Sequence, residues 1–394
     1  MENYAFALAG GGAKGIYQIG AWKALEEIGI SCCAVAGTSI GAVNGAFIAQ
    51  GDYQKAYDMW ANIRMDQCVR IPETRGLVSD NLLDRQHAGI LLREVIFNRG
   101  IDQSPFQELL ATYLAVDSVY ASDIDLGICT FELNSRSAVK IWKSEIPKDL
   151  FFSYLLASSA YPGLKIVKMD EKLYMDGGLS DNLPMDMLSS RGYRNIVAID
   201  IRSKKNHTLA SDRLRITHIC NSMDLGGTLD LSPEILSRNF ELGYLDTYKT
   251  FGKYDGIHYY IPTDDYRNLM CMYKEIGVSG LEQAALAYKI PREQARSADD
   301  FLRILRARRQ ESQAEYEMAR KKIDADGILS GVRNGSLNKL KRMSPSLRLS
   351  LLMELIADAK KNGSKWTIPA KLFRDLDLAA NALLLLDPPS LGDQ

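Results

Sequence analysis

The sequence predicts an α/β fold with a mixed, mostly parallel central sheet, followed by a helical C-terminal region. In the first half of the chain, short apolar runs typical of buried strands alternate with helix patterns that end at a glycine. Alternation of this kind implies helices on both faces of the sheet. The predicted strands are residues 4–9, 31–36, 126–131, 138–142 and 196–201, and the predicted helices between the first strands are residues 13–28 and 41–50.

The character of the sequence changes near residue 262. Around and beyond this point the pattern predicts a helix over 233–251, a short strand over 256–262, and helices over 297–323 and 344–361. We therefore predict two domains. The first is residues 1–262, with a motif-bearing core at about 5–200, and the second is a mainly helical, basic region over 263–394 that is a candidate regulatory region.

The charge of the chain is balanced overall but unevenly distributed. The chain has 48 Lys and Arg against 49 Asp and Glu, so no overall field attracts a nucleic-acid polymer, and we expect none as a partner. Residues 289–374 nevertheless carry 20 basic against 10 acidic residues. On a helix, Arg303, Arg306 and Arg309 would form one basic stripe, which is either a solvated face or a surface for anionic phosphates.

Composition excludes several classes of protein. Apolar residues make up 46% of the 394 residues and charged residues 25%, which excludes a largely disordered chain. No run approaches the roughly 18 apolar residues of a membrane-spanning helix, and the first residues lack the features of a signal peptide. The six Cys and four His form no CxxC pair or ligand cluster. We therefore expect a cytoplasmic protein with reduced cysteines, no metal and no cofactor.

The first motif is a glycine-rich loop, GGGAKG at residues 10–15, between a predicted strand and a predicted helix. It matches the dinucleotide-binding pattern GxGxxG, but the acidic residue that this pattern requires at the end of the second strand is missing. It also departs from the P-loop, because Lys14 precedes Gly15 rather than Ser or Thr. Backbone N–H groups at a helix N-terminus remain, and they can hold a phosphate or a developing oxyanion.

The second motif, GTSIG, consists of Gly37, Thr38, Ser39, Ile40 and Gly41 between a predicted strand and a predicted helix. The alternative is an ordinary turn bracketed by glycines. The strand–turn–helix context favours a nucleophile elbow, in which Ser39 occupies a strained tight turn. In that arrangement Gly37 and Gly41 are needed because a side chain at either position would clash with the neighbouring strand or helix.

The third motif is Asp176-Gly177-Gly178, which taken alone predicts only a turn. A loop of small residues at 157–163 precedes it and is a candidate border of a cleft. Since no His lies nearby in sequence, the simplest arrangement has Asp176 acting on Ser39 directly. A Ser–His–Asp triad is not excluded, because its members need not be close in sequence. A carboxylate with a pKa of about 3.9 becomes a useful base when a cleft desolvates it.

In their order and spacing, the three motifs resemble those of the patatin-like phospholipases. The resemblance covers about residues 5–200, continues more loosely to 262, and implies the three-layer α/β fold of that family. It implies that Ser39 is the nucleophile and Asp176 its general base in a Ser–Asp dyad. The oxyanion hole that it implies is the loop of Gly10, Gly11, Gly12, Lys14 and Gly15, with the amides of Gly11 and Gly12 binding the oxyanion.

The activity implied by the resemblance is hydrolysis of fatty-acyl esters of phospholipids through an acyl-enzyme intermediate. The residues alone indicate only an ester of an apolar acyl chain. The chain also resembles bacterial patatin-like enzymes that degrade membranes in anti-phage defence when a cyclic oligonucleotide activates them, and such an effector is one alternative. Another is an inactive module that binds an anion at the glycine loop. We expect the protein to act from the cytoplasm on phospholipids of the inner membrane, as a peripheral protein. A homo-oligomer is one state of assembly that the sequence allows.

Overall fold

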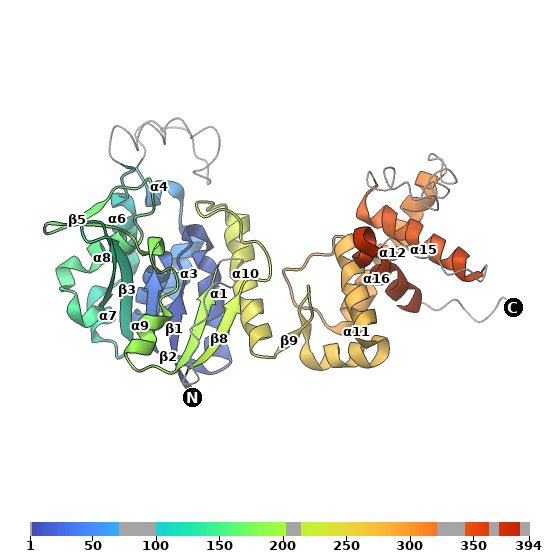
Figure 1. The fold of residues 1–394 in the computed structure, drawn as a ribbon, viewed down its shortest axis with the longest axis horizontal. Helices are drawn as coiled ribbons and strands as arrows, with labels where there is room; N and C mark the ends of the chain where they lie inside the picture. Colours follow the sequence, from blue (N-terminus) through green and yellow to red (C-terminus); the bar gives the residue numbers. More distant parts are fainter. Residues whose placement is uncertain (1, 71–99, 202–213, 321–342, 362–369, 387–394) are drawn as a thin grey trace. The chain divides into compact units, whose positions relative to one another are not determined.

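The computed structural model describes residues 2–70, 100–201, 214–320, 343–361 and 370–386 (Figure 1). Contacts divide the chain into two units, Met1–Phe251 and Gly252–Gln394. The predicted domain boundary at 262 falls inside the second unit. The reason is that β9 (Tyr254–Asp255) and β10 (Ile261–Pro262) pair with each other and contact the helix that follows them.

Within the described residues, eight strands of the first unit form one sheet. The order is β5-β6-β3-β2-β1-β7-β8, and β4 also pairs with β3. The strands are β1 (Glu2–Leu8), β2 (Ile30–Thr38), β3 (Asp125–Glu132), β4 (Ser137–Trp142), β5 (Val167–Met169), β6 (Lys172–Asp176), β7 (Asn195–Asp200) and β8 (Arg215–Cys220). The pairs among β3, β2, β1, β7 and β8 are parallel, whereas β4, β5 and β6 pair antiparallel. The prediction of a mixed, mostly parallel sheet is confirmed.

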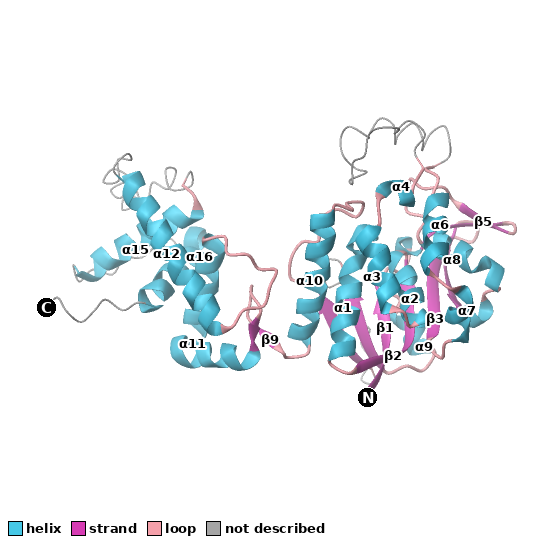
Figure 2. Cartoon of the chain, turned by 180° about the vertical axis from the view of Figure 1, so that it is seen from behind, coloured by secondary structure: helices cyan, strands magenta, loops and turns pink. Residues whose placement is uncertain are grey.

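Helices cover both faces of this sheet (Figures 1 and 2). The helices of the first unit are α1 (Ile16–Glu27), α2 (Ile40–Gln50), α3 (Tyr53–Asn62), α4 (Met65–Cys68), α6 (Ser104–Tyr113), α7 (Val116–Ala121), α8 (Phe151–Ser158), α9 (Met185–Ser190) and α10 (Pro233–Thr250). Gly45 of α2 lies against Leu126, whereas Met187 of α9 lies against the next residue, Gly127. Because successive strand residues point to opposite faces, α2 and α9 lie on opposite sides of the sheet.

Helices α1 and α10 cross at two glycines. A Cβ atom on Gly243 would lie 1.9 Å from the carbonyl oxygen of Tyr17, and one on Gly20 would lie 2.0 Å from that of Phe240. The buried Tyr17 hydroxyl also donates a hydrogen bond of 2.9 Å to Asp246. Helix α1 therefore has a fixed position, and the glycine-rich loop that leads into it is anchored at its C-terminal end.

The second unit is mainly helical. Its helices are α11 (Thr263–Ala287), α12 (Ala298–Arg320), α15 (Pro345–Lys361) and α16 (Ala370–Leu386). They enclose a separate apolar core, to which α11, α12 and α16 contribute Leu281, Phe301 and Leu383. Among the helices of the described residues, none is long and apolar enough to cross a membrane.

The predicted basic stripe on α12 does not form one free surface. Arg309 donates a hydrogen bond of 2.8 Å to the carbonyl oxygen of Leu383 on α16, and Arg303 pairs with Asp300 at 2.8 Å. Leu302, which directly precedes the first arginine of the stripe, is buried. The prediction was wrong for Arg309, because a contact with another helix uses its guanidinium group. Several other basic residues of this region, among them those at 321, 322, 339, 341 and 342, lie outside the described residues.

Replacing Gly243 by Ala tests the crossing of α1 and α10. The added methyl group would meet a backbone carbonyl that cannot move alone, so we expect the free energy of unfolding to fall by about 2 kcal/mol or more. The matched control is Gly45→Ala on α2, where the nearest atoms are side-chain methyl groups at 3.2 Å. We expect this control to stay within about 1 kcal/mol of wild type in urea denaturation, since Ala favours a helix. Equal stability of the two variants would contradict the close crossing.

Candidate active site

Ser39 lies at the junction of β2 and α2 in a strained backbone conformation. Its φ is 56° and its ψ is −128°, which a residue with a side chain rarely adopts. The chain can turn this sharply because both neighbouring glycines are pressed against backbone. A Cβ atom on Gly37 would lie 2.2 Å from the carbonyl oxygen of Gly41, and one on Gly41 would lie 2.3 Å from that of Leu8. The geometry is that of a nucleophile elbow.

Two hydroxyl groups hold the elbow from outside. The Ser39 N–H donates to Ser158 Oγ at 2.8 Å, and Ser158 Oγ donates to the carbonyl oxygen of Cys129 at 2.6 Å. Thr38 Oγ1 donates to the carbonyl oxygen of Asp181 at 2.8 Å. The sequence indicated the loop at 157–163 as the border of a cleft, but gave no sign that Ser158 fastens the elbow to β3.

The ends of β2 and β6 converge on neighbouring residues of β3. Thr38, the last residue of β2, pairs with Cys129, and Asp176, the last residue of β6, pairs with Thr130. Strand β4 pairs along residues 127–132, so β2 and β6 share the opposite edge of β3. They run in opposite directions along that edge, and their carboxyl ends therefore meet. This arrangement brings Ser39 and Asp176 together.

The turn after β6 fits closely against the sheet. Asp176 is 5% exposed, and its Oδ1 accepts a hydrogen bond of 2.7 Å from the N–H of Gly178. A Cβ atom on Gly177 would lie 2.3 Å from the carbonyl oxygen of Cys129, and one on Gly178 would lie 3.0 Å from Asp176 Oδ1. Gly177 is therefore required by its close approach to the strand that also receives the Ser158 hydroxyl, whereas Gly178 lies close to the side-chain oxygens of Asp176 and Asn182.

The glycine-rich loop lies directly against the elbow. A Cβ atom on Gly10 would be 3.0 Å from Ser39 Cβ. Asn182 clamps the loop, since Gly10 N–H donates to its carbonyl oxygen at 3.1 Å and its own Nδ2 donates to the Gly10 carbonyl at 3.0 Å. Gly12 has a φ of +59°, and a Cβ atom there would lie 2.2 Å from the Thr228 carbonyl oxygen. The loop after β1 is thus fixed by two other loops.

The backbone N–H groups of this loop fall into two sets. Those of Gly10 and Ala13 donate to the carbonyl oxygens of Asn182 and Thr228. Those of Gly11 and Gly12 donate to no group in the part of the chain that the structure describes. Gly12 begins a 3-10 turn, Gly12–Gly15, before α1, so the predicted helix start at 13 is a tighter turn. The two N–H groups without partners can receive an anion beside Ser39.

A buried network of amide side chains supports the loop from below. Gln18 Nε2 donates to the Ala9 carbonyl at 2.7 Å, and Asn44 Nδ2 donates to the Gly15 carbonyl at 2.9 Å and to Gln18 Oε1 at 2.8 Å. Trp60 Nε1 donates to Asn44 Oδ1 at 3.0 Å. Gln18 and Asn44 are fully buried. The network therefore binds both ends of the loop to α1, α2 and α3, and no motif in the sequence indicated it.

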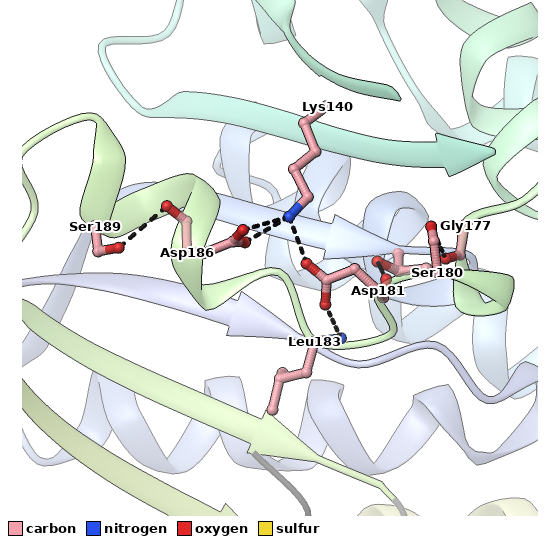
Figure 3. A network of polar contacts seen from close by, with 8 residues as sticks. Lys140, Gly177, Ser180, Asp181, Leu183, Asp186 and Ser189 are labelled. Carbon is pink, nitrogen blue, oxygen red and sulfur yellow. Dashed lines mark hydrogen bonds and ion pairs between the residues drawn. The ribbon is translucent and has the colours of Figure 1, made fainter. Parts of the chain in front are cut away.

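A charged group fastens the segment after the Asp-Gly-Gly turn (Figure 3). Lys140 on β4 contacts Asp181 at 2.7 Å and Asp186 on α9 at 2.6 Å. Burial alone would lower the pKa of Lys140, but its hydrogen bonds and ion pairs with the two carboxylates outweigh burial and hold that pKa above its usual value. Burial would likewise raise the pKa of Asp186, and Lys140 reverses this effect. Lys140 and Asp186 therefore both stay charged at neutral pH.

Ser39, Asp176 and the glycine loop line one cavity of about 520 Å³. Of the predicted site residues, Gly10, Gly11, Gly12, Lys14, Ser39, Ile40, Asp176 and Gly178 line it, whereas Gly15, Gly37, Thr38, Gly41 and Gly177 are not among its lining residues. Much of the remaining wall is apolar and includes Trp60, Ile63, Phe106, Leu229 and Leu231. The cavity therefore suits a chain of apolar carbon atoms next to a reactive polar group.

Other nucleophiles and bases are poorly placed in this cavity. Burial raises the pKa of the Cys68 thiol, which also lines the cavity, to about 12, so it is not a thiolate at neutral pH. No histidine lines the cavity among the described residues, and His218 and His258 lie elsewhere, on β8 and in the second unit. His87 and His207 lie outside the described residues. In the described residues, no group of three His, Cys, Asp or Glu is arranged to hold a metal.

Comparisons with known proteins match the same part of the chain. Residues 6–189 match the family model described as "Patatin-like phospholipase". Patatin-like phospholipase domain-containing protein 6 of Homo sapiens is 29% identical over 218 residues, which cover 53% of this chain and 14% of that protein. Lysophospholipase nte1 of Aspergillus terreus is 29% identical over 210 residues, covering 52% and 12%. The match thus spans about a seventh or less of the length of these curated relatives.

A solved structure is also similar to the chain. The crystal structure of VipD from Legionella pneumophila aligns over 100% of this chain and 93% of that chain. The sequence identity of this alignment is 13% and its TM-score is 0.41.

Replacing Asn44 by Ala tests the buried amide network. The change would leave Trp60 Nε1 and Gln18 Oε1 without their partner, and we expect the free energy of unfolding to fall by about 1–3 kcal/mol. Asn62→Ala is the matched control, because Asn62 is exposed on α3 and, within the described residues, its side chain bonds only to the Asp58 carbonyl one turn earlier. We expect that control to change stability by about 0.5 kcal/mol or less in urea denaturation. An Asn44 variant as stable as the control would show that the network does not hold the loop.

Proposed function

We propose that this chain hydrolyses fatty-acyl esters of phospholipids, with Ser39 as the nucleophile. Its residues 6–189 match the patatin-like phospholipase family model. The observation that carries the proposal is the meeting of β2 and β6 on neighbouring residues of β3, since it brings a strained serine and a buried carboxylate together beneath the glycine loop. Serine with a neighbouring base and an oxyanion site is the arrangement of a nucleophilic hydrolase.

The proposed reaction proceeds in two halves. Ser39 Oγ attacks the ester carbonyl while Asp176 accepts its proton, and the N–H groups of Gly11 and Gly12 stabilise the oxyanion of the tetrahedral intermediate. The intermediate collapses to an acyl-enzyme, and the leaving alcohol takes the proton from Asp176. Water then attacks the acyl-enzyme with Asp176 again as the base, which releases the fatty acid and restores Ser39.

The environment of Asp176 supports its role as the base. Its carboxylate is almost fully buried at the end of β6, where it lines the same cavity as Ser39. The N–H of Gly178 holds Oδ1 in place at 2.7 Å, which orients the carboxylate. The proposal therefore needs no histidine between Asp176 and Ser39.

The walls of the cavity support the choice of substrate. An apolar surface beside Ser39 suits a fatty-acyl chain, and two of the similar proteins are named as a phospholipase domain-containing protein and a lysophospholipase. We propose that the enzyme takes its substrates from the surface of the inner membrane. We do not extend the proposal to an activating nucleotide, because Arg303 and Arg309 of the predicted basic stripe have partners within the second unit.

The dyad predicts a pattern of mutational effects on hydrolysis of a p-nitrophenyl acyl ester. Ser39→Ala and Asp176→Asn should each lower kcat/KM by on the order of 10³-fold or more, because nucleophile and base act as a unit. Gln in place of His87, His207, His218 or His258 should lower it less than about tenfold, which is less than the loss of a general base costs. Circular dichroism provides the control for folding. A histidine variant as inactive as Ser39→Ala would contradict the dyad and show that the site is a catalytic triad.

A further inference from the structure

Exposed apolar side chains of the first unit concentrate at the mouth of the cavity. Among its described residues, the large exposed ones are Tyr57, Tyr161, Ile166 and Leu179, which are 38%, 47%, 44% and 52% exposed. Tyr161 and Leu179 line the cavity, and Ile166 follows two residues after Leu164, which also lines it. Single exposed apolar residues are normal on a protein surface, but two that line one cavity, with a third two residues beyond another lining residue, indicate a contact site.

Hydrogen bonds fix the backbone that carries Tyr161 and Ile166. Ile101 N–H donates to the Gly163 carbonyl at 2.9 Å, and Lys165 N–H donates back to the Ile101 carbonyl at 2.9 Å. Gln103 Nε2 adds a bond of 3.2 Å to the Lys165 carbonyl. The backbone that carries Tyr161 and Ile166 is therefore fixed along one edge by Ile101 and Gln103.

Leu179 is fixed by a separate turn. It ends the 3-10 turn Gly177–Leu179, directly after Asp176. The turn is closed by the hydrogen bonds that Ser180 and Asp181 donate to the Gly177 carbonyl at 3.0 and 2.9 Å. Leu179 is consequently only three residues along the chain from Asp176, the carboxylate of the proposed dyad.

Charges beside the mouth indicate what kind of surface it meets. The exposed charged residues of this segment are Lys165, Lys168, Asp170, Glu171 and Lys172, and the third positive group, Lys172, pairs with the carboxylate of Glu132 at 3.1 Å. Lys168 and Glu171 lie 3.7 Å apart. A balanced set of charges around an apolar centre matches a zwitterionic phospholipid surface, whereas an anionic surface would call for an excess of basic residues.

We propose that Tyr161, Ile166 and Leu179 form a docking surface for a zwitterionic phospholipid bilayer. The inference rests on the proposed function and deepens it. The three side chains insert among the lipids at the cavity opening, so that a phospholipid acyl chain moves from the bilayer along apolar wall toward Ser39 without crossing water. The docking surface thus couples binding of the membrane to entry of the substrate.

The test compares one substitution at two exposed isoleucines. Ile166→Asp places a charge on the docking surface, and Ile276→Asp on α11 is the matched control, because Ile276 is 73% exposed and lies in the second unit. Binding to phosphatidylcholine vesicles is measured by flotation, together with hydrolysis of the vesicles and of a soluble short-chain ester. Ile166→Asp should weaken vesicle binding by about tenfold or more, since binding strength follows the inserted apolar area. Ile276→Asp should bind as wild type does.

Two further readouts separate docking from other effects. Ile166→Asp should lower vesicle hydrolysis much more than hydrolysis of the soluble ester, and Ile166→Trp should bind vesicles at least as tightly as wild type. Equal losses on vesicles and soluble ester, wild-type vesicle binding by Ile166→Asp, or an equal loss for Ile276→Asp would overturn the proposal. So would binding of the wild type to phosphatidylglycerol vesicles alone.

The binding measurement also separates this inference from the proposed function. Flotation does not depend on catalysis, so it reports on docking even if the protein hydrolyses no ester. A wild type that binds phosphatidylcholine vesicles through Ile166 but is inactive would contradict the proposed function and leave the docking surface intact. An active wild type whose vesicle binding ignores Ile166 would contradict only the docking surface.

Discussion

The backbone conformation of Ser39 is the constraint on which the rest of the site depends. Holding a residue with a side chain at a φ of 56° and a ψ of −128° costs about 1–3 kcal/mol, so the surroundings must enforce it. They do so by close approach. Gly41 lies against the carbonyl of Leu8, and Gly37 lies against that of Gly41. Ser158 Oγ accepts a hydrogen bond from the N–H of Ser39. A side chain at either glycine would push α2 away from the sheet and remove the strain together with the exposure of the hydroxyl.

Strand β3 is the element that organises the groups around this turn. The Cys129 carbonyl receives the Ser158 hydroxyl, and Gly177 packs against the same carbonyl. Its neighbour Thr130 pairs with Asp176 and donates its hydroxyl to the Met175 carbonyl at 2.8 Å. One peptide unit therefore sets the positions of both the elbow and the carboxylate. Burial raises the pKa of the Cys129 thiol to about 12, so it is not a thiolate at neutral pH.

The sequence predicted those parts of the site whose chemistry is local. Two glycines on either side of a serine, between a strand and a helix, indicate a nucleophile elbow directly. Such a turn needs glycines because the backbone of neighbouring elements approaches too closely for a side chain. Strands β5 and β6 were not predicted, since they are three and five residues long and largely half-exposed or exposed. Gln18 and Asn44 were also missed. A polar residue in a helix pattern usually faces water, and only the folded chain reveals that these two face each other beneath the loop.

Tertiary contacts also explain why the prediction for α12 was wrong at Arg309. The regular spacing of arginines on this helix had suggested a free basic stripe. The guanidinium group of Arg309 instead bonds a carbonyl of α16, a helix more than 60 residues away in sequence. Helical spacing states which residues share a face, but it does not state what packs against that face. The same limit explains the domain boundary, because the pairing of β9 with β10 attaches that segment to the helical unit.

The most direct test of the central claim is covalent labelling of the nucleophile. A fluorophosphonate phosphonylates a serine hydroxyl that is activated by a base and loses fluoride in the process. The account predicts one adduct per chain, located on Ser39 by peptide mass spectrometry, forming much more slowly in Asp176→Asn and not at all in heat-denatured protein. Labelling of a different residue, or labelling of Ser39 at an unchanged rate in Asp176→Asn, would contradict the activation of Ser39 by Asp176.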